Sequence, residues 1–374
     1  MIVFSSILLL SYFILIIWLT DGLRKNSNEE KIEATSNLPF VTVIVSARNE
    51  QDNIDNLCTC FQDQKYPTDN LEIIIVNDRS TDNTPALLKK WENQISNLNV
   101  ITVKDTPVGW APKKWALNQA ISASKNEILI QTDADCIFSE NWLRAMVQPF
   151  ADSNTGFVSG PAPLIHSNKL INSMFEMESL SMDAFFGGAI KRRIPISCTG
   201  RNMGFRKDAF NQVGGYQDIS DQISGDDDLL LQKFALSSNW DIEFVNNPDS
   251  VVKSLAPDSL ESFISQRMRF ASKGFKYYNL PTTSQIKLIL PYIFFCNLLV
   301  MICTIKFTIQ AEFVWLLPLI MKILSDGWIT IVFYSNINKR WTFKEFAIMS
   351  ILHPFYVVIF ALIAPFTQIN WKNE

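Results

Sequence analysis

The stretch Ile128-Leu-Ile-Gln-Thr-Asp-Ala-Asp135 joins a short apolar run to two carboxylates that are two positions apart. In a strand that rises to the edge of a sheet, residues i and i+2 point to the same side, so we expect Asp133 and Asp135 to converge on one hard cation. Such a cation usually keeps several waters and is shared with substrate phosphates. A solvated turn after a strand has the same signature, and the neighbouring segments decide between the two interpretations.

Strand and helix patterns alternate around this stretch. Strands are predicted at residues 41–45, 71–76, 100–104 and 127–131, and helices at residues 54–64, 84–93 and 114–124. This alternation predicts an α/β domain whose mostly parallel sheet is flanked by helices and binds ligands beyond the carboxyl ends of its strands. Three of the strands end in polar residues: Arg48-Asn-Glu50, Asn77-Asp78 and the Asp133/Asp135 pair. Three coincident polar ends favour a ligand site over a simple turn.

The 374 residues are 48% hydrophobic, and the apolar residues are concentrated in four segments. Residues 1–20, 288–305, 315–334 and 346–366 are each near the ~20 residues that a helix needs to cross a bilayer. We therefore predict a transmembrane helix at 1–20, a polar linker at 21–38, a large soluble domain at 39–285 and three transmembrane helices within 286–374. Inside the third span, Lys322 and Asp326 are predicted to form an internal ion pair.

Basic residues are placed asymmetrically around these spans. Arg24, Lys25 and Lys31 follow the first span, and the loop Asn336-Ile-Asn-Lys-Arg340 between the last two spans is also basic. The positive-inside rule then places the large domain in the cytoplasm, in an integral protein of the inner or plasma membrane. A cleaved signal followed by a periplasmic domain is the rival interpretation, but no Lys or Arg precedes the first span.

Composition argues against a zinc site and against a nucleic-acid surface. The six cysteines are scattered, there are two histidines, and the formal net charge is −4. This pattern is typical of a reduced cytosolic domain and gives no reason to expect nucleic acid as a partner.

Five sequence blocks resemble the membrane-embedded branch of the family 2 glycosyltransferases. They are Val41-Thr-Val-Ile-Val-Ser-Ala-Arg-Asn-Glu50, Val76-Asn-Asp-Arg-Ser-Thr-Asp82, Gln131-Thr-Asp-Ala-Asp135, Gly214-Gly-Tyr216 with Gly225-Asp-Asp-Asp-Leu229, and Gln266-Arg-Met-Arg-Phe270. The resemblance covers residues 39–275. It implies a GT-A type fold and sugar transfer from a nucleotide diphosphate sugar with the help of Mg²⁺ or Mn²⁺.

The resemblance also implies which residues bind the nucleotide sugar. It places Asp78 at the nucleotide with Glu50 nearby, and Lys113 near the nucleotide. From the residues alone, Asp78 is also compatible with a turn-forming role before Ser80. Lys113 is likewise compatible with a solvated charge at the start of a helix. Lys114 could then take the place near the nucleotide that the resemblance gives to Lys113.

The metal and the catalytic base are assigned by the same resemblance. Asp133 is expected on the ribose side, and Asp135 on the Mg²⁺ or Mn²⁺ ion that neutralises charge on the leaving diphosphate. The base comes from the run Asp226, Asp227 and Asp228: aligning on Asp-Asp favours Asp227, and aligning on Glu-Asp-x-Asp favours Asp226. We favour Asp227. An acidic helix N-terminus, stabilised by the helix dipole, is the alternative for at least one of the three.

Two further segments are predicted to lie at the membrane surface. By the resemblance, Gln266, Arg269 and Phe270 contact the nucleotide sugar, with Arg269 on the diphosphate and Phe270 in place of the usual Trp. A basic cluster that touches anionic lipid is the alternative. Interfacial helices are predicted near residues 170–186, where core packing is the alternative, and near residues 258–280.

The predicted function is an inverting glycosyltransferase that moves a sugar, expected to be UDP-linked, to a lipid hydroxyl at the cytoplasmic membrane face. Its expected partners are the nucleotide diphosphate sugar, a lipid or glycan acceptor and membrane lipids. The layout of one span before the domain and three after it resembles lipid glycosyltransferases such as ceramide glucosyltransferases. Two alternatives remain: a processive polysaccharide synthase of the same family, and a non-catalytic membrane scaffold that binds nucleotide sugar or lipid.

Overall fold

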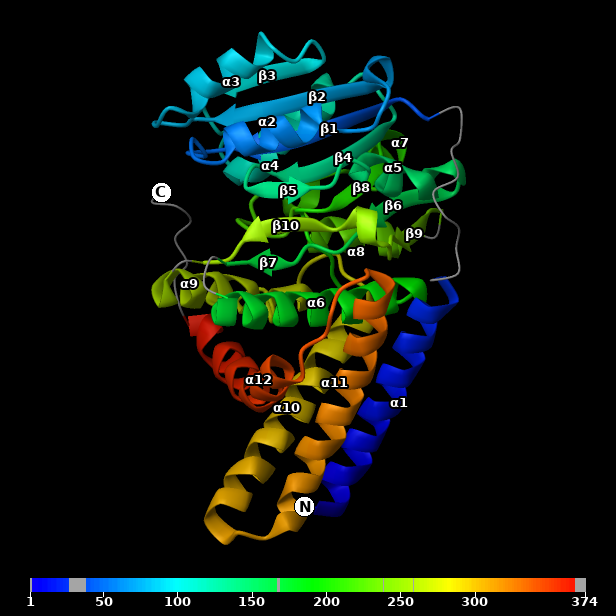
Figure 1. The fold of residues 1–374 in the computed structure, drawn as a ribbon, viewed down its shortest axis with the longest axis vertical. Helices are drawn as coiled ribbons and strands as arrows, with labels where there is room; N and C mark the ends of the chain where they lie inside the picture. Colours follow the sequence, from blue (N-terminus) through cyan, green and yellow to red (C-terminus); the bar gives the residue numbers. More distant parts are fainter. Residues whose placement is uncertain (1, 27–37, 167–168, 238, 258, 367–374) are drawn as a thin grey trace. The chain divides into compact units, whose positions relative to one another are not determined.

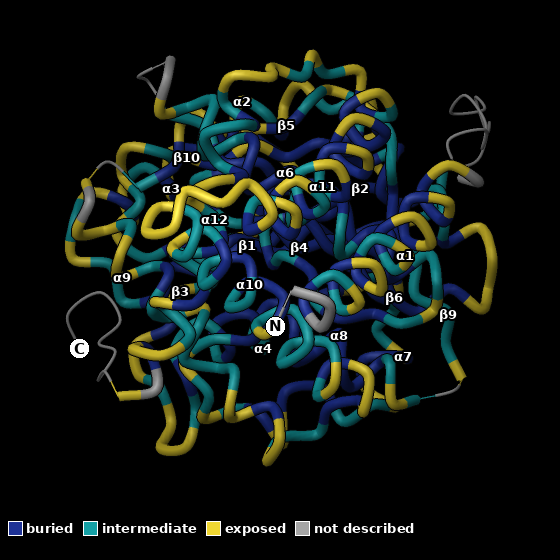
Figure 2. Tube along the Cα trace, turned by 90° about the horizontal axis from the view of Figure 1, so that it is seen from below, coloured by how far each residue is buried: buried dark blue, intermediate teal, exposed yellow. Residues whose placement is uncertain are grey.

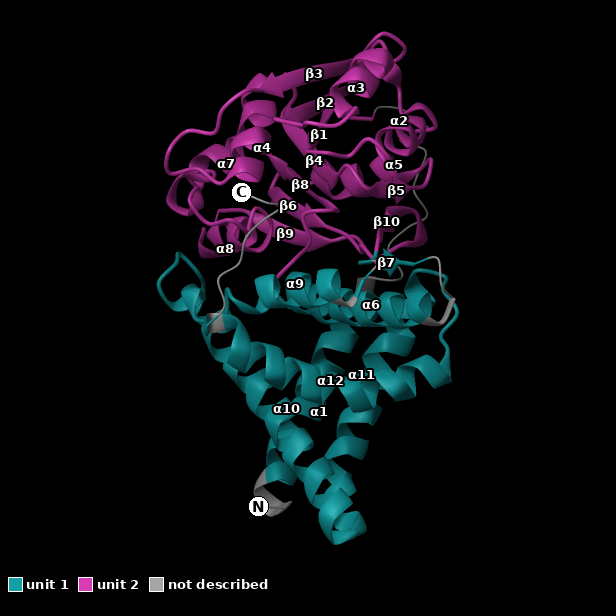
Figure 3. Cartoon of the chain, turned by 90° about the vertical axis from the view of Figure 1, so that its left-hand side faces the viewer, with its two compact units in different colours: residues 1–27, 164–194, 256–374 teal, residues 28–163, 195–255 magenta. Residues whose placement is uncertain are grey.

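The computed structural model describes residues 2–26, 38–166, 169–237, 239–257 and 259–366. The chain divides into two compact units, shown in different colours in Figure 3. Unit 1 comprises residues 1–27, 164–194 and 256–374, and unit 2 comprises residues 28–163 and 195–255. Each unit is described by itself.

Unit 2 is built on a seven-stranded sheet with the order β3-β2-β1-β4-β8-β6-β9 (Figure 1). Its strands are β1 (Val41–Ala47), β2 (Leu71–Asp78), β3 (Leu98–Val103), β4 (Ile128–Asp133), β6 (Thr155–Ser159), β8 (Met203–Arg206) and β9 (Asp241–Phe244). The four strands β3, β2, β1 and β4 run parallel, and β8 is antiparallel to both of its neighbours. The predicted mostly parallel sheet is therefore confirmed.

Helices follow most strands of unit 2, and those after β1, β2 and β3 were predicted from the sequence patterns. They are α2 (Ile54–Gln62), α3 (Thr84–Glu92), α4 (Pro112–Ala123), α5 (Trp142–Val147), α7 (Lys207–Gln212) and α8 (Asp228–Leu236). The predictions at 54–64, 84–93 and 114–124 correspond to α2, α3 and α4, with ends that differ by one or two residues. Two short strands, β5 (Cys136–Phe138) and β10 (Val252–Leu255), pair with each other in antiparallel fashion.

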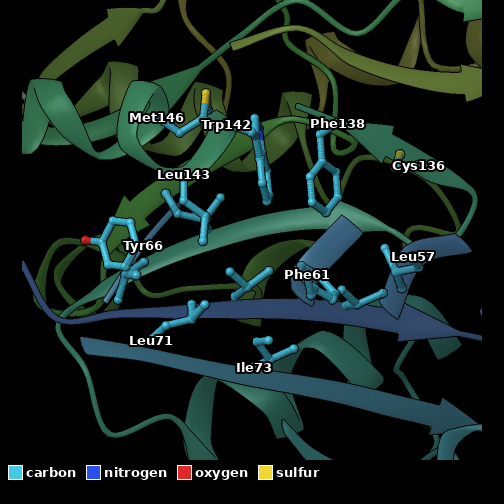
Figure 4. Close-up of a cluster of buried hydrophobic side chains, with 14 of the residues drawn as sticks. Leu57, Phe61, Tyr66, Leu71, Ile73, Cys136, Phe138, Trp142, Leu143 and Met146 are labelled. Atoms are coloured by element: carbon cyan, nitrogen blue, oxygen red, sulfur yellow. The ribbon is translucent and has the colours of Figure 1, made fainter. Parts of the chain in front are cut away.

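The core of unit 2 fixes the strands whose ends carry the polar residues. All eight residues of β2 are buried, and β1 and β4 are buried along nearly their whole length (Figure 2). Figure 4 shows the aromatic part of this core, where the rings of Phe138 and Trp142 stack with centroids 4.2 Å apart and Phe61 packs against Phe138. Strands that are buried on both faces read as continuous apolar runs. Packing on both faces fixes where their carboxyl ends place the polar side chains.

Unit 1 contains the long apolar helices. Its helices are α1 (Ile2–Asn26), α6 (Lys169–Lys191), α9 (Leu260–Ala271), α10 (Ser284–Gln310), α11 (Leu317–Asn336) and α12 (Phe343–Ile363). Among the described residues, four helical segments are long and apolar enough to cross a membrane: Ser5–Arg24, Ser284–Gln310, Phe313–Asn336 and Phe343–Ile363. One precedes the sheet domain and three follow it, which confirms the predicted layout.

The first helix continues past residue 20, where the sequence predicted its end. Leu23 is fully buried, and Arg192, in the turn after α6, donates to the Asp21 carboxylate and to the backbone carbonyl of Trp18. These contacts stabilise the polar end of α1, which stays helical through Asn26. The helix thus occupies the first part of the predicted linker, and residues 27–37 lie outside the described residues.

A polar pair lies inside the apolar helices of unit 1, as predicted. Lys322 and Asp326 of α11 form an ion pair, and the Tyr12 hydroxyl of α1 donates to Asp326 Oδ1 at 2.6 Å. A charged side chain in the middle of a membrane helix costs about 2.5–3.5 kcal/mol on insertion scales. Pairing offsets this cost, and the tyrosine extends the polar contact to a second helix.

Three helices of unit 1 meet at a buried ion pair. Glu178 of α6 accepts hydrogen bonds from Nη2 of Arg267 in α9 at 2.5 Å and from the Tyr356 hydroxyl of α12 at 2.6 Å. Only 5% of Glu178 and 6% of Arg267 is exposed. The helix α6 covers residues 170–186, and its interfacial placement stays a prediction.

We expect the substitution Glu178→Gln to lower the free energy of unfolding by about 3–5 kcal/mol, because it leaves the buried Arg267 charge uncompensated. Thermal unfolding of the purified chain in detergent measures the effect. The control is Glu140→Gln, which breaks the exposed pair between Lys65 and Glu140 and is expected to cost less than about 1 kcal/mol. Equal losses in the two variants would contradict the stabilising role of the buried pair.

Candidate active site

The loops after β1 and β2 are tied together at the carboxyl edge of the sheet. Asn49 and Arg79 both have left-handed backbone conformations with φ of 55°, which Asn adopts more readily than most residues. The Asn49 N–H donates to Ser80 Oγ at 3.0 Å, and Asn49 Oδ1 accepts from the Thr81 N–H at 2.8 Å. These bonds hold the two loops side by side beyond a neighbouring pair of parallel strands.

Glu50 lies on the loop after β1, and Asp78 is the last residue of β2. The Glu50 carboxylate accepts a hydrogen bond from the side chain of Asn53 at 2.7 Å. Asp78 is 2% exposed, and its Oδ1 accepts from Nε of Arg79 at 2.9 Å. The turn-forming side chain is its neighbour Asn77, whose Oδ1 accepts from the N–H three residues on at 3.3 Å. Asp78 therefore does not fill the turn role, and its carboxylate stays at the strand end.

Lys113, in the first turn of α4, bridges two carboxylates from distant parts of the chain. Its Nζ lies 2.9 Å from Oδ1 of Asp133 and 3.0 Å from Oδ2 of Asp226. Burial by itself lowers the pKa of Lys113, but the attraction of the two carboxylates outweighs it and holds this pKa well above its ordinary value. Burial raises the pKa of Asp133; Lys113 opposes this, whereas Asp135 and Asp226 add to it. The ammonium ion is what keeps the two carboxylates together.

Gln131 and Gly200 complete the surroundings of Asp226. Nε2 of Gln131 lies 3.2 Å from Oδ2 of Asp226 and also donates to the Gly200 carbonyl at 3.2 Å. A Cβ atom added to Gly200 would lie 3.0 Å from Oδ2 of Asp226. Thr132 donates to the Arg201 carbonyl at 2.8 Å, so the loop before β8 is fastened to the end of β4.

The three consecutive aspartates have different partners. Asp226 faces Lys113, whereas Asp227 accepts backbone N–H groups on both oxygens: Gly200 at 3.0 Å on Oδ2 and Asp228 at 2.7 Å on Oδ1. Asp228 is buried, and its Oδ1 accepts from the Leu229 N–H at 2.9 Å. The alternative interpretation, an acidic helix N-terminus, thus applies to two of the three: Asp227 caps α8, and Asp228 lies in the first turn of α8. Of the three, the geometry favours Asp226 for chemistry.

Asp135 lies two residues beyond Asp133, in the turn between β4 and β5. Its Oδ2 accepts from Ser254 Oγ at 2.9 Å, and its Oδ1 is 3.8 Å from the Cys136 sulfur. The side chain is partly exposed. Burial raises the pKa of the Cys136 thiol well above its ordinary value, and the Asp135 charge adds to this. The thiol therefore stays protonated, and the carboxylate is the group that presents hard oxygens.

Comparison with protein families identifies the domain. Residues 42–214 match Glycosyl transferase family 2. The chain contains a family 2 glycosyltransferase domain. The matched region contains Glu50, Asp78, Lys113, Asp133 and Asp135, and Asp226 follows it closely.

Relatives of this family 2 domain have different named products. A beta-monoglucosyldiacylglycerol synthase from Nostoc sp. is 27% identical over 250 residues, which are 66% of this chain and 51% of that protein. A poly-beta-1,6-N-acetyl-D-glucosamine synthase from Staphylococcus aureus is 25% identical over 290 residues, 72% of this chain and 65% of that protein. The chain spans about half the length of the monoglucosyldiacylglycerol synthases that it matches.

A solved structure supports the fold. The mannosyltransferase from Pyrobaculum calidifontis in complex with GDP-Man and Mn²⁺ has a TM-score of 0.58 and 18% identity to this chain. The alignment covers 100% of both chains. The likeness extends to the GT-A fold, in agreement with the fold class predicted from the sequence.

The family 2 domain fits a divalent cation whose coordination is completed by substrate phosphates. Mg²⁺ commonly takes one or two protein carboxylates together with substrate phosphates. Within the described parts of the chain, no three His, Cys, Asp or Glu side chains are grouped to hold a metal ion by themselves. Asp135 presents carboxylate oxygens in the turn after β4, whereas Asp133 faces Lys113. The donor set thus fits a shared cation with Asp135 as the protein ligand.

Sequence reasoning missed two contributors to this family 2 site. The contacts of Gln131 and Gly200 with the aspartate run were not predicted. Gln131 carried a usable signal, because a polar residue at the end of an otherwise apolar strand must find a partner when it is buried. Gly200 carried no such signal. A residue without a Cβ is needed there because its loop lies close to the aspartate run, and the sequence does not show which loops meet.

Lys114 does not share the role of Lys113. It is 1% exposed, and its Nζ donates to the carbonyls of Gln222 at 2.5 Å and Ser224 at 3.0 Å. Lys114 therefore anchors the segment that leads to Asp226.

We expect Lys114→Met to lower the free energy of unfolding by about 1–3 kcal/mol, because it leaves buried carbonyls unsatisfied. Chemical denaturation of the purified chain measures the loss. The control Lys125→Met removes a lysine whose side chain is 81% exposed, and we expect a change within about 0.5 kcal/mol. An Lys114 variant as stable as this control would show that the anchor is dispensable.

Three predicted donor-binding residues belong to unit 1. Gln266, Arg269 and Phe270 lie on α9, and the Arg269 guanidinium carbon is 5.2 Å from the centroid of the Phe270 ring. Phe270 is 41% exposed and thus keeps an accessible aromatic face. The contact of these residues with a nucleotide sugar stays a prediction.

Proposed function

We propose that this chain is an inverting glycosyltransferase that transfers a sugar from a nucleotide diphosphate sugar to an acceptor hydroxyl. The observation that carries the proposal is the Lys113 bridge, which gathers Asp133 and Asp226 at the end of β4 beside Asp135. Ligands of such a sheet bind at the edge where the strands end. There the Lys113 ammonium suits a diphosphate leaving group, and a carboxylate suits a base that accepts a proton.

The reaction is a single displacement. A carboxylate accepts the proton of the acceptor hydroxyl while that oxygen attacks the anomeric carbon, and the bond from this carbon to the diphosphate oxygen breaks. The nucleoside diphosphate leaves, and the anomeric centre inverts because one direct attack occurs from the opposite face. Asp135 would hold a Mg²⁺ or Mn²⁺ ion, which would supply positive charge to balance the charge that grows on the diphosphate.

We assign the base to Asp226 rather than to Asp227. Asp227 is engaged on both oxygens by backbone N–H groups, which is a structural role. Asp226 instead faces Lys113 and Gln131, among the groups that surround the transferred sugar in this proposal. The preference for Asp227 drawn from the sequence alone is thus replaced.

The remaining residues are proposed to bind the donor. Asp78 and Glu50 would receive the nucleoside, which is expected to be UDP-linked, and Asp133 would steady the ribose side. In unit 1, Arg269 would pair with the diphosphate through its guanidinium fork, with Gln266 and Phe270 beside it on α9.

The proposed acceptor is a lipid at the cytoplasmic face of the membrane. One apolar span precedes the domain and three follow it, and the Nostoc relative is named for a diacylglycerol product. Basic residues after the first span and between the last two spans support the cytoplasmic side. A processive polysaccharide synthase is the second candidate, because the Staphylococcus aureus relative is named for a polymer and its match covers 72% of this chain.

The test is to incubate membranes that contain the chain with a panel of labelled UDP- and GDP-sugars. Extraction with organic solvent then separates a labelled lipid from a labelled polymer. Label in the organic phase supports the lipid acceptor, and label in a long water-soluble polymer supports the synthase. Membranes with Asp226→Asn are the control for other transferases. If no donor yields a product above this control, the glycosyltransferase proposal fails and the binding scaffold is favoured.

A further inference from the structure

The proposed base is held by a cation in the structure. The Lys113 ammonium is shared between Asp133 Oδ1 and Asp226 Oδ2, at 2.9 and 3.0 Å. The Lys113 side chain is 25% exposed and that of Asp226 10%. A carboxylate that balances a nearby ammonium ion is a poor proton acceptor, because protonation leaves the cation with less compensation. Asp226 must therefore be released from Lys113 before it accepts a proton.

A diphosphate is the anion placed to take Lys113 away. Asp135 lies two residues beyond Asp133, in the turn after β4, and two residues span at most about 7 Å of chain. A diphosphate bound through a cation at Asp135 would therefore lie within reach of the flexible lysine beside Asp133. A diphosphate offers several anionic oxygens, whereas Asp226 offers Lys113 one. The competition favours the diphosphate for as long as the donor is bound.

We propose that Lys113 is a charge lock on the base: it holds Asp226 until the diphosphate of the donor draws the ammonium away. This inference rests on the proposed function and deepens it, because it makes release of the base depend on donor binding. Lys113 is then a positioning residue whose partner changes during the cycle. Asp133 is the fixed member of the bridge, and Gln131 continues to orient Asp226 after the lysine has left.

The lock is tested by a double-mutant cycle on nucleotide binding, which needs no activity. Calorimetry of the purified full chain with UDP and with GDP, each in Mg²⁺, gives the dissociation constants. Asp226→Asn removes the competitor for Lys113, so we expect binding of the nucleotide to tighten by about 3- to 10-fold. In a Lys113→Met background the same substitution is expected to change binding by less than about twofold, since no lock is left to open.

Two controls separate the lock from general charge effects. Asp227→Asn removes a neighbouring charge that does not contact Lys113, and we expect it to leave binding unchanged. Lys113→Gln is a second uncharged variant that carries the cycle if Lys113→Met does not fold.

The outcomes discriminate between the lock and the function. If Asp226→Asn tightened nucleotide binding equally in the presence and absence of Lys113, the cause would be relief of repulsion between Asp226 and the nucleotide. That result would overturn the lock. Unchanged or weaker binding in Asp226→Asn would overturn it too, while the proposed function stands. If the unsubstituted chain binds neither nucleotide, the proposed function fails and the lock falls with it.

Discussion

Asp226→Asn is expected to lower the turnover of sugar transfer by at least about 100-fold, because general-base catalysis typically contributes 10²–10⁴-fold. The amide has nearly the same shape as the carboxylate but accepts no proton at neutral pH. The Michaelis constant for the donor should not rise, because Asp226 balances Lys113 and is not proposed to bind the sugar nucleotide. Initial rates with the donor and acceptor identified in the membrane assay measure the effect.

The neighbouring substitution Asp227→Asn is the matched control. Its side-chain oxygen can still accept one backbone N–H group, so the cap of α8 is weakened rather than lost. We expect a loss of transfer below about tenfold, because the change costs roughly 1 kcal/mol of stability and removes no group with a proposed catalytic role. A larger loss in Asp227→Asn than in Asp226→Asn would restore Asp227 as the base.

Asp135→Ala is expected to lower sugar transfer by about 100- to 1000-fold, because metal neutralisation of a leaving diphosphate supplies several kcal/mol. Chelation of divalent ions should lower the rate of the unsubstituted chain to a similar degree, and added Mg²⁺ or Mn²⁺ should restore it. In the variant, added metal should restore little. Rates over a range of free metal concentrations measure both effects.

Ser254→Ala is the control for this site. It removes the hydrogen bond to Oδ2 of Asp135 but leaves the carboxylate in place. Losing one such bond costs about 1 kcal/mol, so we expect a decrease in transfer of up to about tenfold and normal restoration by metal. Full transfer by the unsubstituted chain in the presence of excess chelator would refute the metal mechanism.

The sheet and the spans were predictable from the sequence because both depend on local patterns. The apolar runs that became β1, β2 and β4 are continuous because these strands are buried, and polar residues mark their ends. The four apolar segments were long enough to predict their number and order. Burial and length are properties of single segments, and a sequence displays them directly.

The different contacts that neighbouring residues make were not predictable from the sequence. Lys113 and Lys114 are equivalent in sequence, yet one faces two carboxylates and the other two backbone carbonyls. Asp226 and Asp227 likewise differ, because Lys113 and Gln131 contact Asp226 whereas the Gly200 N–H donates to Asp227. Such choices follow from which loop packs on which strand end, and that information is spread over more than a hundred residues.

The grouping of α6 with the long apolar helices was also not predicted. The segment 164–194 lies in the middle of the predicted soluble domain, but it belongs to unit 1. Its buried Glu178 reaches Arg267 and Tyr356, which come much later in the chain. An amphipathic helix predicts that one face is covered and leaves open what covers it.

The contact between Tyr12 and Asp326 has a consequence for biosynthesis. The first helix emerges from the ribosome more than three hundred residues before Asp326, its hydrogen-bond partner, is made. Until then Tyr12 lacks this acceptor, whereas Arg192, the partner of Asp21 and Trp18 in α1, is made much earlier. The contacts of α1 are therefore completed in two stages, and the contact with Asp326 is the later of the two.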